Sequence, residues 1–142
     1  MKTEILEINS PEYWEIRHQR EPWPRTSGWV QSLLKEIVPV NARVLEVGAG
    51  QGAASWALLC NRPDIRVKCT DISPTAIKRA QETYKDLDPN ITFQVADVFN
   101  LSIDLKDEEY DYVISIQNFE HWPVETHKEA FHQIWKRIIP GG

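Results

Sequence analysis

The chain has 142 residues, which is long enough for one hydrophobic core but not for two. Apolar residues make up 42% of it and charged residues 26%, both ordinary values for a globular domain. The net charge of −5, without a Lys/Arg cluster, argues against a nucleic-acid partner, because nucleic-acid binding depends on neutralising phosphates. No apolar stretch reaches the length of a membrane span, and charges interrupt the N-terminus where a signal peptide would be apolar. We therefore expect a cytoplasmic protein with no membrane partner.

The segment before residue 43 is expected to contain two helices. The first opens at Ser10, and the second is expected over residues 27–38. Pro22 and Pro24 separate them, because proline restricts its own backbone and that of the residue before it. The apolar residues of the second helix fall on one helical stripe, which comprises Val30, Leu33, Leu34 and Ile37.

A glycine-rich loop follows the short apolar run at residues 43–47. Glycine stands at alternate positions, Gly48, Gly50 and Gly52, and residues 53–60 then have the composition of a helix. Glycines permit a tight turn and close approach of the backbone, and the N-terminus of a helix offers unpaired N–H groups to an anion. The segment therefore predicts a site for a nucleotide-like ligand.

Two further strands are each followed by an acidic residue. The second strand ends at Asp71, after which Ser73 is a candidate N-cap with Pro74 at the first helical position. The third strand covers residues 91–95 and leads to Asp97. The first strand carries Glu46 close to its end, so three acids stand at the carboxyl ends of consecutive predicted parallel strands, where open α/β sheets bind ligands. Asp71 as a turn cap and Asp97 as the start of a loop are the simpler alternatives.

A fourth strand is predicted over residues 110–116, and an amphipathic helix over 124–139 closes the chain. The helix carries apolar residues at helical spacing, namely Phe131, Ile134, Trp135 and Ile138. Cys60 and Cys69 are expected to be buried and reduced. The four histidines are scattered, without carboxylate or thiol partners at metal-site spacing, so no metal is expected.

The glycine loop is compatible with two cofactors. Gly48, Gly50 and Ala53 satisfy the dinucleotide fingerprint G-x-G-x-x-G/A, which allows a NAD-dependent oxidoreductase. However, Glu46 two residues before the first glycine, together with Gly52, gives E-x-G-x-G-x-G. This arrangement resembles motif I of the class I S-adenosylmethionine-dependent methyltransferases.

Later segments resemble the same family in the order that it uses them. They are Asp71 after the second strand, Asp97 after the third, the pair Glu120-His121 after the fourth, and the turn Pro140-Gly141-Gly142. The resemblance covers about residues 43–142. It implies an α/β, Rossmann-like doubly wound parallel sheet with strand order 3-2-1-4, lacking the last strands of the full methyltransferase fold.

The resemblance also assigns the cofactor, S-adenosylmethionine, to particular residues. The loop from Glu46 to Gly52 would lie under its methionine portion, with loop amides and the end of the next helix facing the carboxylate. Asp71 would accept hydrogen bonds from the ribose diol, because a carboxylate is an acceptor with two oxygens. Adenine would be bound by the residues after the second and third strands. The complete set of implied cofactor residues is Glu46, Gly48, Ala49, Gly50, Gly52, Asp71, Ile72, Asp97, Val98 and Gln117.

The implied reaction is methyl transfer to a small-molecule acceptor. His121 is a candidate base because its ordinary pKa is near neutrality, although it could equally cap a helix or pack under the loop. Glu120 is a weaker catalytic candidate. Residues 1–42 would form an N-terminal helical cap region over a partial cofactor-binding core at 43–142, and its candidate pocket residues are Tyr13, Trp14, Arg17 and Trp23. These aromatic residues could also serve packing alone.

The sequence leaves other readings open. The resemblance stops in the middle of the fold, with the fourth strand at an outer edge, and an unpaired apolar edge favours association. A fragment of a longer enzyme is the favoured interpretation, and a homodimer through the edge of the fourth strand is the other. A NAD-dependent oxidoreductase and a non-catalytic cofactor-binding or interaction module remain alternative functions.

Overall fold

The computed structural model describes residues 10–20, 28–84 and 86–142, and it contains a four-stranded parallel sheet. The strand order is β3-β2-β1-β4, which confirms the predicted order. The strands are β1 (Arg43–Val47), β2 (Arg66–Asp71), β3 (Ile91–Val95) and β4 (Tyr112–Ser115). Because all the strands run in one direction, their carboxyl ends meet at one edge of the sheet.

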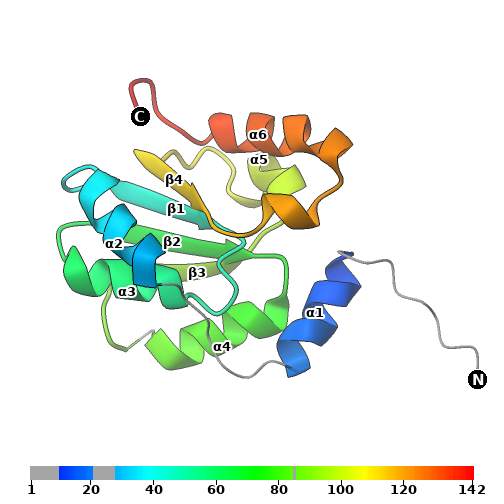
Figure 1. Ribbon diagram of the computed structural model, residues 1–142, viewed down its shortest axis with the longest axis horizontal. Helices are drawn as coiled ribbons and strands as arrows, with labels where there is room; N and C mark the ends of the chain where they lie inside the picture. The colour runs from blue at the N-terminus through cyan, green and yellow to red at the C-terminus, as the bar shows by residue number, and fades with distance from the viewer. Residues whose placement is uncertain (1–9, 21–27, 85) are drawn as a thin grey trace, which may run out of the picture.

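Helices cover both faces of the sheet, as a doubly wound fold requires. In Figure 1, α2, α3 and α4 lie on one face, and α5 and α6 lie on the other. The α-helices are α1 (Pro11–Arg20), α2 (Gly28–Ile37), α3 (Ala53–Asn61), α4 (Pro74–Tyr84), α5 (Leu101–Asp104) and α6 (His127–Trp135). Three short 3₁₀ turns are η1 (Val98–Asn100), η2 (Phe119–His121) and η3 (Val124–Thr126).

The two faces have separate apolar cores because neighbouring residues of a strand point to opposite sides. Val44 packs with the core that contains Leu34 of α2 and Leu58 of α3. Leu45 belongs to the opposite core, which contains Leu101 and residues of α6. Val44 and Leu45 are both 0% exposed, so β1 is buried on both faces in the centre of the sheet.

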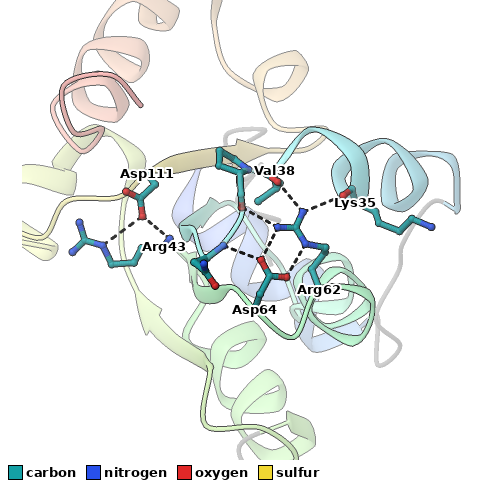
Figure 2. A network of polar contacts seen from close by, with 8 residues as sticks. Lys35, Val38, Arg43, Arg62, Asp64 and Asp111 are labelled. Carbon is teal, nitrogen blue, oxygen red and sulfur yellow. Dashed lines mark hydrogen bonds and ion pairs between the residues drawn. The ribbon is translucent and has the colours of Figure 1, made fainter.

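Arg62 fixes the connection between α2 and β1, far from the carboxyl ends of the strands (Figure 2). Its Nε and Nη2 donate to the two carboxylate oxygens of Asp64 at 2.8 and 2.7 Å. Its remaining N–H groups donate to backbone carbonyls, which are those of Lys35, Val38 and Pro39. The hydrogen bonds from Arg62 hold the pKa of Asp64 well below its usual range. A bidentate pair that also caps a helix end gives this turn one defined geometry.

Three details differ from the sequence-based expectations. The closing helix is shorter than 124–139, because η3 precedes it and α6 ends at Trp135. Phe131 and Trp135 are 60% and 73% exposed, since α6 contacts the core through Ala130 and Ile134, one residue before each. Cys60 is exposed and only Cys69 is buried, because the buried residues of α3 stand at other positions of the helix.

The expected fourth strand is also shorter, and its first residues take another partner. Tyr110 forms an isolated parallel bridge with Ile138. Its N–H donates to the carbonyl of Arg137 at 2.7 Å, and its own carbonyl accepts from Ile139 N–H at 3.0 Å. β4 lies at the edge of the sheet, and a homodimer through this edge stays a prediction. Within the described residues, no helix is long and apolar enough to cross a membrane.

Candidate functional site

A cavity of about 540 Å³ lies at the carboxyl ends of the strands. Figure 1 shows α1 beyond the arrowheads of the sheet, so that this helix faces the strand ends. The cavity is lined by the loops after all four strands and by α1. Its lining residues are Pro11, Trp14, Arg17, His18, Val30, Glu46, Val47, Gly48, Ala49, Gly50, Gln51, Ala54, Asp71, Ile72, Ala96, Asp97, Val98, Phe99, Ile116, Gln117, Asn118, His121 and Trp122.

The glycine loop needs glycine for conformation and for space. Gly48 has φ +69°, and a Cβ atom there would lie 2.2 Å from Oδ1 of Asn118. Gly52 has φ +79°, and its Cβ would lie 2.8 Å from the ring of Phe93. Gly52 is the N-cap of α3 and does not line the cavity, so its visible role is in the turn and its packing. Residues that carry a side chain rarely adopt these left-handed backbone conformations, which explains why glycine stands at these positions.

Asp71 connects the glycine loop to the turn after β2. Its Oδ2 accepts a hydrogen bond from Gly50 N–H at 2.8 Å, and its Oδ1 accepts one from Ser73 N–H at 2.9 Å. The side chain is 7% exposed and lines the cavity. A carboxylate offers about four acceptor positions, so each oxygen keeps one for a ligand. Turn capping and ligand binding are therefore compatible at this residue.

Glu46 is a buried acid in the wall of the cavity, with 3% of its surface exposed. Burial raises its pKa to about 7, the hydrogen bonds from Ser55 lower it, and the nearby charge of Asp71 raises it. Both the hydroxyl and the backbone N–H of Ser55, in the first turn of α3, bond to this carboxylate. Glu46 therefore occupies the N-terminal end of α3 itself.

Asp97 begins the turn after β3. Its Oδ1 accepts a hydrogen bond from Phe99 N–H at 2.9 Å, which makes it the N-cap of η1. Val98 and Phe99 follow it in the cavity wall. Asp97 is half-buried and has the apolar Val98 and the ring of Phe99 beside it. This arrangement suits the edge and the face of a heterocycle.

Asn118 joins the end of β4 to the end of β1. Its Nδ2 lies 2.9 Å from the carbonyl of Val47 and 3.0 Å from that of Ile116. Its Oδ1 fills the space above Gly48. Gln117, just before it, has φ +55° and lines the cavity. The sequence reasoning missed Asn118, because only the fold brings residue 118 to the glycine loop.

Aromatic and imidazole rings form the wall opposite the strand ends. The rings of Trp14 and His121 meet edge to face with centroids 4.9 Å apart. Nε2 of His127 lies 2.9 and 3.1 Å from the carbonyls of Phe119 and Trp122, so it must donate to hold the η2 turn. His127 thus fixes the turn that presents His121 to the cavity.

Polar contacts hold α1 against α4. The Glu15 carboxylate accepts a hydrogen bond from Ser73 Oγ at 2.5 Å, and the hydroxyl and N–H of Thr75 also donate to it. Arg79 donates to the carbonyls of His18 and Gln19 at the other end of α1. Burial acts to raise the pKa of Glu15, but the bonds from Ser73 and Thr75 outweigh it and lower the pKa to about 2.

The cavity brings together most of the residues that the sequence indicated. Every implied cofactor residue except Gly52 lines it, and so does His121. Glu120 does not line it, and its side chain is 54% exposed with one oxygen 4.0 Å from Nε2 of His121. Trp14 and Arg17 line the cavity and Tyr13 does not, whereas Trp23 is outside the described residues. Among the described residues, no group of three or more metal-binding side chains comes together.

Several known proteins are similar to this chain. A release factor glutamine methyltransferase of Streptococcus pneumoniae is 36% identical over 94 residues, which are 66% of this chain and 32% of that protein. Malonyl-[acyl-carrier protein] O-methyltransferase 1 of Ilyobacter polytropus is 32% identical over 99 residues, 70% of this chain and 35% of that protein. A coclaurine N-methyltransferase structure with N-methylheliamine and SAH is similar in fold, with TM-score 0.68, 23% identity, and coverage of 80% of this chain and 33% of that one.

A glycine loop between a central parallel strand and a helix, with acids at the strand ends, defines a Rossmann-like cofactor-binding domain. The sequence family described as a methyltransferase domain matches residues 44–142. The chain therefore belongs to the class I S-adenosylmethionine-dependent methyltransferases, and the cofactor of this family is S-adenosylmethionine. The chain spans about a third of the length of the curated relatives described above.

Proposed function

We propose that this chain binds S-adenosylmethionine in the cavity at the strand ends and transfers its methyl group to a small-molecule acceptor. The observation that carries the proposal is the convergence of three acids, Glu46, Asp71 and Asp97, on one cavity beside the glycine loop. The cavity of about 540 Å³ has the size of a small-molecule site. Acids in this arrangement would suit a ligand with a cationic centre and a vicinal diol.

The residues on the strand-end side of the cavity are assigned to different parts of the cofactor. Asp71 keeps one acceptor position on each oxygen, which suits the two ribose hydroxyls. Ile72 and Val98 give apolar walls for adenine, and Asp97 would accept from its amino group. Glu46 would face the amino group of the methionine part, where an ionised carboxylate is favoured by the ligand's positive charge.

The methionine part and the acceptor side are bounded by the remaining loop residues. Gly48, Ala49 and Gly50 allow the ligand to approach the backbone, and Gln117 adds an amide beside them. Gly52 supports the site as the N-cap of α3. These assignments account for the rest of the cofactor residues that the sequence indicated.

Methyl transfer requires little from the protein beyond positioning the two reactants. Bound S-adenosylmethionine supplies a methyl group that is already activated by the sulfonium. Trp14 and Trp122 would hold the acceptor, and ordering two reactants in line can contribute roughly 7–11 kcal/mol toward the barrier. His121 would take the acceptor's proton where the acceptor needs to lose one, because its ring lies in the same wall. Glu120 would act only through His121.

A small acceptor fits the wall that α1 forms. The relatives include enzymes named for a release factor glutamine and for a malonyl group on acyl-carrier protein, so relatives alone do not choose the acceptor. In this chain α1 lies beyond the strand ends and contributes Trp14, Arg17 and His18 to the cavity, so this helix covers part of the site. We propose on this basis that, of the expected cap region 1–42, α1 covers the cofactor-binding core at 43–142, whereas Leu34 of α2 packs in that core.

Calorimetric titration with S-adenosylhomocysteine, with NAD as the parallel ligand, tests the proposal. We expect S-adenosylhomocysteine to bind at micromolar affinity or better and NAD not to bind, with micromolar affinity corresponding to about −8 kcal/mol. Binding of NAD alone would support the oxidoreductase alternative instead. Binding without methyl transfer to any acceptor would support a non-catalytic module.

Substitution of Asp71 sharpens this test. We expect Asp71→Ala to weaken S-adenosylhomocysteine binding by about 1.5–3 kcal/mol, because charge-assisted hydrogen bonds are lost. Asp71→Asn keeps the size of the side chain but replaces one accepting oxygen with a donating NH2 group, so it should weaken binding in the same direction. Asp107→Ala, at an exposed acid outside the cavity, is the matched control. Unchanged affinity in both Asp71 variants would contradict the ribose assignment.

A further inference from the structure

The glycine loop has few amides left for a ligand. Ala49 N–H donates to the carbonyl of Thr70 at 2.8 Å, and Gly52 N–H donates to the carbonyl of Ala49 at 2.9 Å. Gly50 N–H donates to Asp71 at 2.8 Å. These three amides are therefore committed to the fold, so they are not available to hold the carboxylate of the methionine part.

The N-terminal end of α3 is committed as well. A helix N-terminus attracts an anion, but here the anion is the Glu46 side chain, which bonds to the hydroxyl and N–H of Ser55. A second carboxylate at the same end would be repelled by Glu46 and by Asp71. These contacts and charges favour partners for the cofactor's carboxylate on another side of the cavity.

The first helix supplies basic groups directly above the glycine loop. Cε1 of His18 lies 3.4 Å from the position that a Cβ at Gly50 would take. Arg17 lines the same cavity, with its guanidinium carbon 5.2 Å from the ring centroid of Trp14. α1 is held in this place by the Glu15 and Arg79 contacts with α4.

The cavity is therefore divided by charge. The carboxylates of its lining, Glu46, Asp71 and Asp97, all come from the strand ends, whereas Arg17 and His18 come from α1. The amino group and the carboxylate of the methionine part share one carbon atom, so the amino group can face the acids of the strand ends while the carboxylate faces Arg17 and His18. Arginine is suited to the carboxylate because its planar guanidinium can bond to both oxygens.

We propose that Arg17, together with His18, binds the carboxylate of the methionine part of S-adenosylmethionine, so that α1 completes the cofactor site as well as the acceptor wall. The inference rests on the proposed function above. It assigns to the first helix a role that the sequence reasoning gave to the loop amides.

The experiment compares two ligands that differ in the amino acid part. S-adenosylhomocysteine carries it, whereas 5′-methylthioadenosine keeps the adenosine and the thioether but lacks both the carboxylate and the amino group, of which only the carboxylate is assigned to Arg17. We expect Arg17→Gln to lower the affinity for S-adenosylhomocysteine at least tenfold and to leave that for 5′-methylthioadenosine within about twofold, since a bond to a charged group is lost for one ligand only. Arg20→Gln, at an exposed arginine of the same helix, should change neither affinity.

Every other result overturns the inference, and the results differ in meaning. An equal loss for both ligands would show that Arg17 acts through the placement of α1. An unchanged affinity for S-adenosylhomocysteine, with a raised KM for the acceptor, would assign the basic side to the acceptor. If the unsubstituted chain binds 5′-methylthioadenosine and S-adenosylhomocysteine equally, the carboxylate has no partner at all. If it binds neither, the proposed function itself fails.

Discussion

β1 and α1 both reach the cofactor cavity, but different interactions hold them in the protein. Val44 and Leu45 of β1 are 0% exposed, and each belongs to an apolar core on one face of the sheet. None of the ten residues of α1, all of them described, is buried. α1 is attached instead through Glu15 and Arg79, whose hydrogen bonds compete with water. We therefore expect the strand-end side of the cavity to be rigid and α1 to be released without unfolding of the sheet.

The largest expected contrast is between apolar truncations in the two regions. Leu45→Ala should lower the free energy of unfolding by about 2–5 kcal/mol, because it removes buried methyl groups and leaves a cavity. Ile16→Ala on α1 should lower it by less than about 1 kcal/mol, because Ile16 is only half-buried. Urea unfolding measures both. A loss at Ile16 as large as that at Leu45 would place α1 within the cooperative core.

A glycine substitution tests the rigidity of the strand-end side. Gly48→Ala should lower the free energy of unfolding by about 2–4 kcal/mol, since it combines left-handed strain with a clash against Asn118. Gly141→Ala is the control, because Gly141 also has a positive φ of +89° but no atom within 4 Å of its Cβ position. It should show the strain alone, about 1–2 kcal/mol. Thermal unfolding of the two variants separates conformational strain from close packing, and equal losses would contradict the role of Asn118.

The attachment of α1 is tested by removing one charge. Glu15→Gln loses the carboxylate that accepts from Ser73 and Thr75, so α1 should dock less tightly. We expect the affinity for S-adenosylhomocysteine to fall about threefold to tenfold, or roughly 0.7–1.4 kcal/mol, while the free energy of unfolding changes by less than that. Glu12→Gln, at an exposed acid of the same helix, is the control and should change neither quantity.

The pH dependence of α1 docking follows from the same contact. The pKa of Glu15 is lowered to about 2 in the folded protein, below its ordinary value of 4.5. Its contribution is therefore complete above about pH 4.5 and is lost as the pH falls toward 2. Protection of α1 amides from hydrogen exchange should be constant near neutrality. A loss of protection between pH 8 and pH 6 would mean that another group holds the helix.

The features that the sequence could predict depend on local patterns of neighbouring residues. β3 was expected at residues 91–95 and lies there, because a short segment in which apolar and polar residues alternate between turns is typical of a strand. Ser73 was expected to cap α4, and its Oγ does accept from Ala76 N–H at 3.1 Å. Strand order and the position of the acids followed from the resemblance to a family, since parallel sheets collect strand ends at one edge.

The features that the sequence could not predict depend on residues far apart in the chain. Glu15 and Ser73 are 58 positions apart and are joined by one polar contact, which leaves no periodic signal. Asn118 is 71 positions from Val47, and its role depends on the gap above Gly48. The exposure of Cys60 depends on which face α3 turns to the sheet, and an almost uniformly apolar helix does not reveal that face.

A further expected effect concerns the charge of Glu46 at the boundary between the two regions. Its pKa is raised to about 7 in the folded protein, first by burial, against the bonds from Ser55, and also by Asp71. Between pH 4.5 and 7 the folded state thus binds more protons at this residue than the unfolded state does. The free energy of unfolding should therefore decrease as the pH rises through this window, and Glu46→Gln should remove that part of the slope.

Cofactor binding should oppose this titration. If Glu46 faces the amino group of the ligand, binding favours its ionised form, so the affinity for S-adenosylhomocysteine should rise several-fold from pH 6 to pH 8. Calorimetry at pH 6 in two buffers of different ionisation enthalpy should detect the released proton. His18 and His121 line the same cavity, so Glu46→Gln is the necessary control. If the pH dependence persists in that variant, the released proton must come from another group. His18 on α1 and His121 on η2 would then be the candidates.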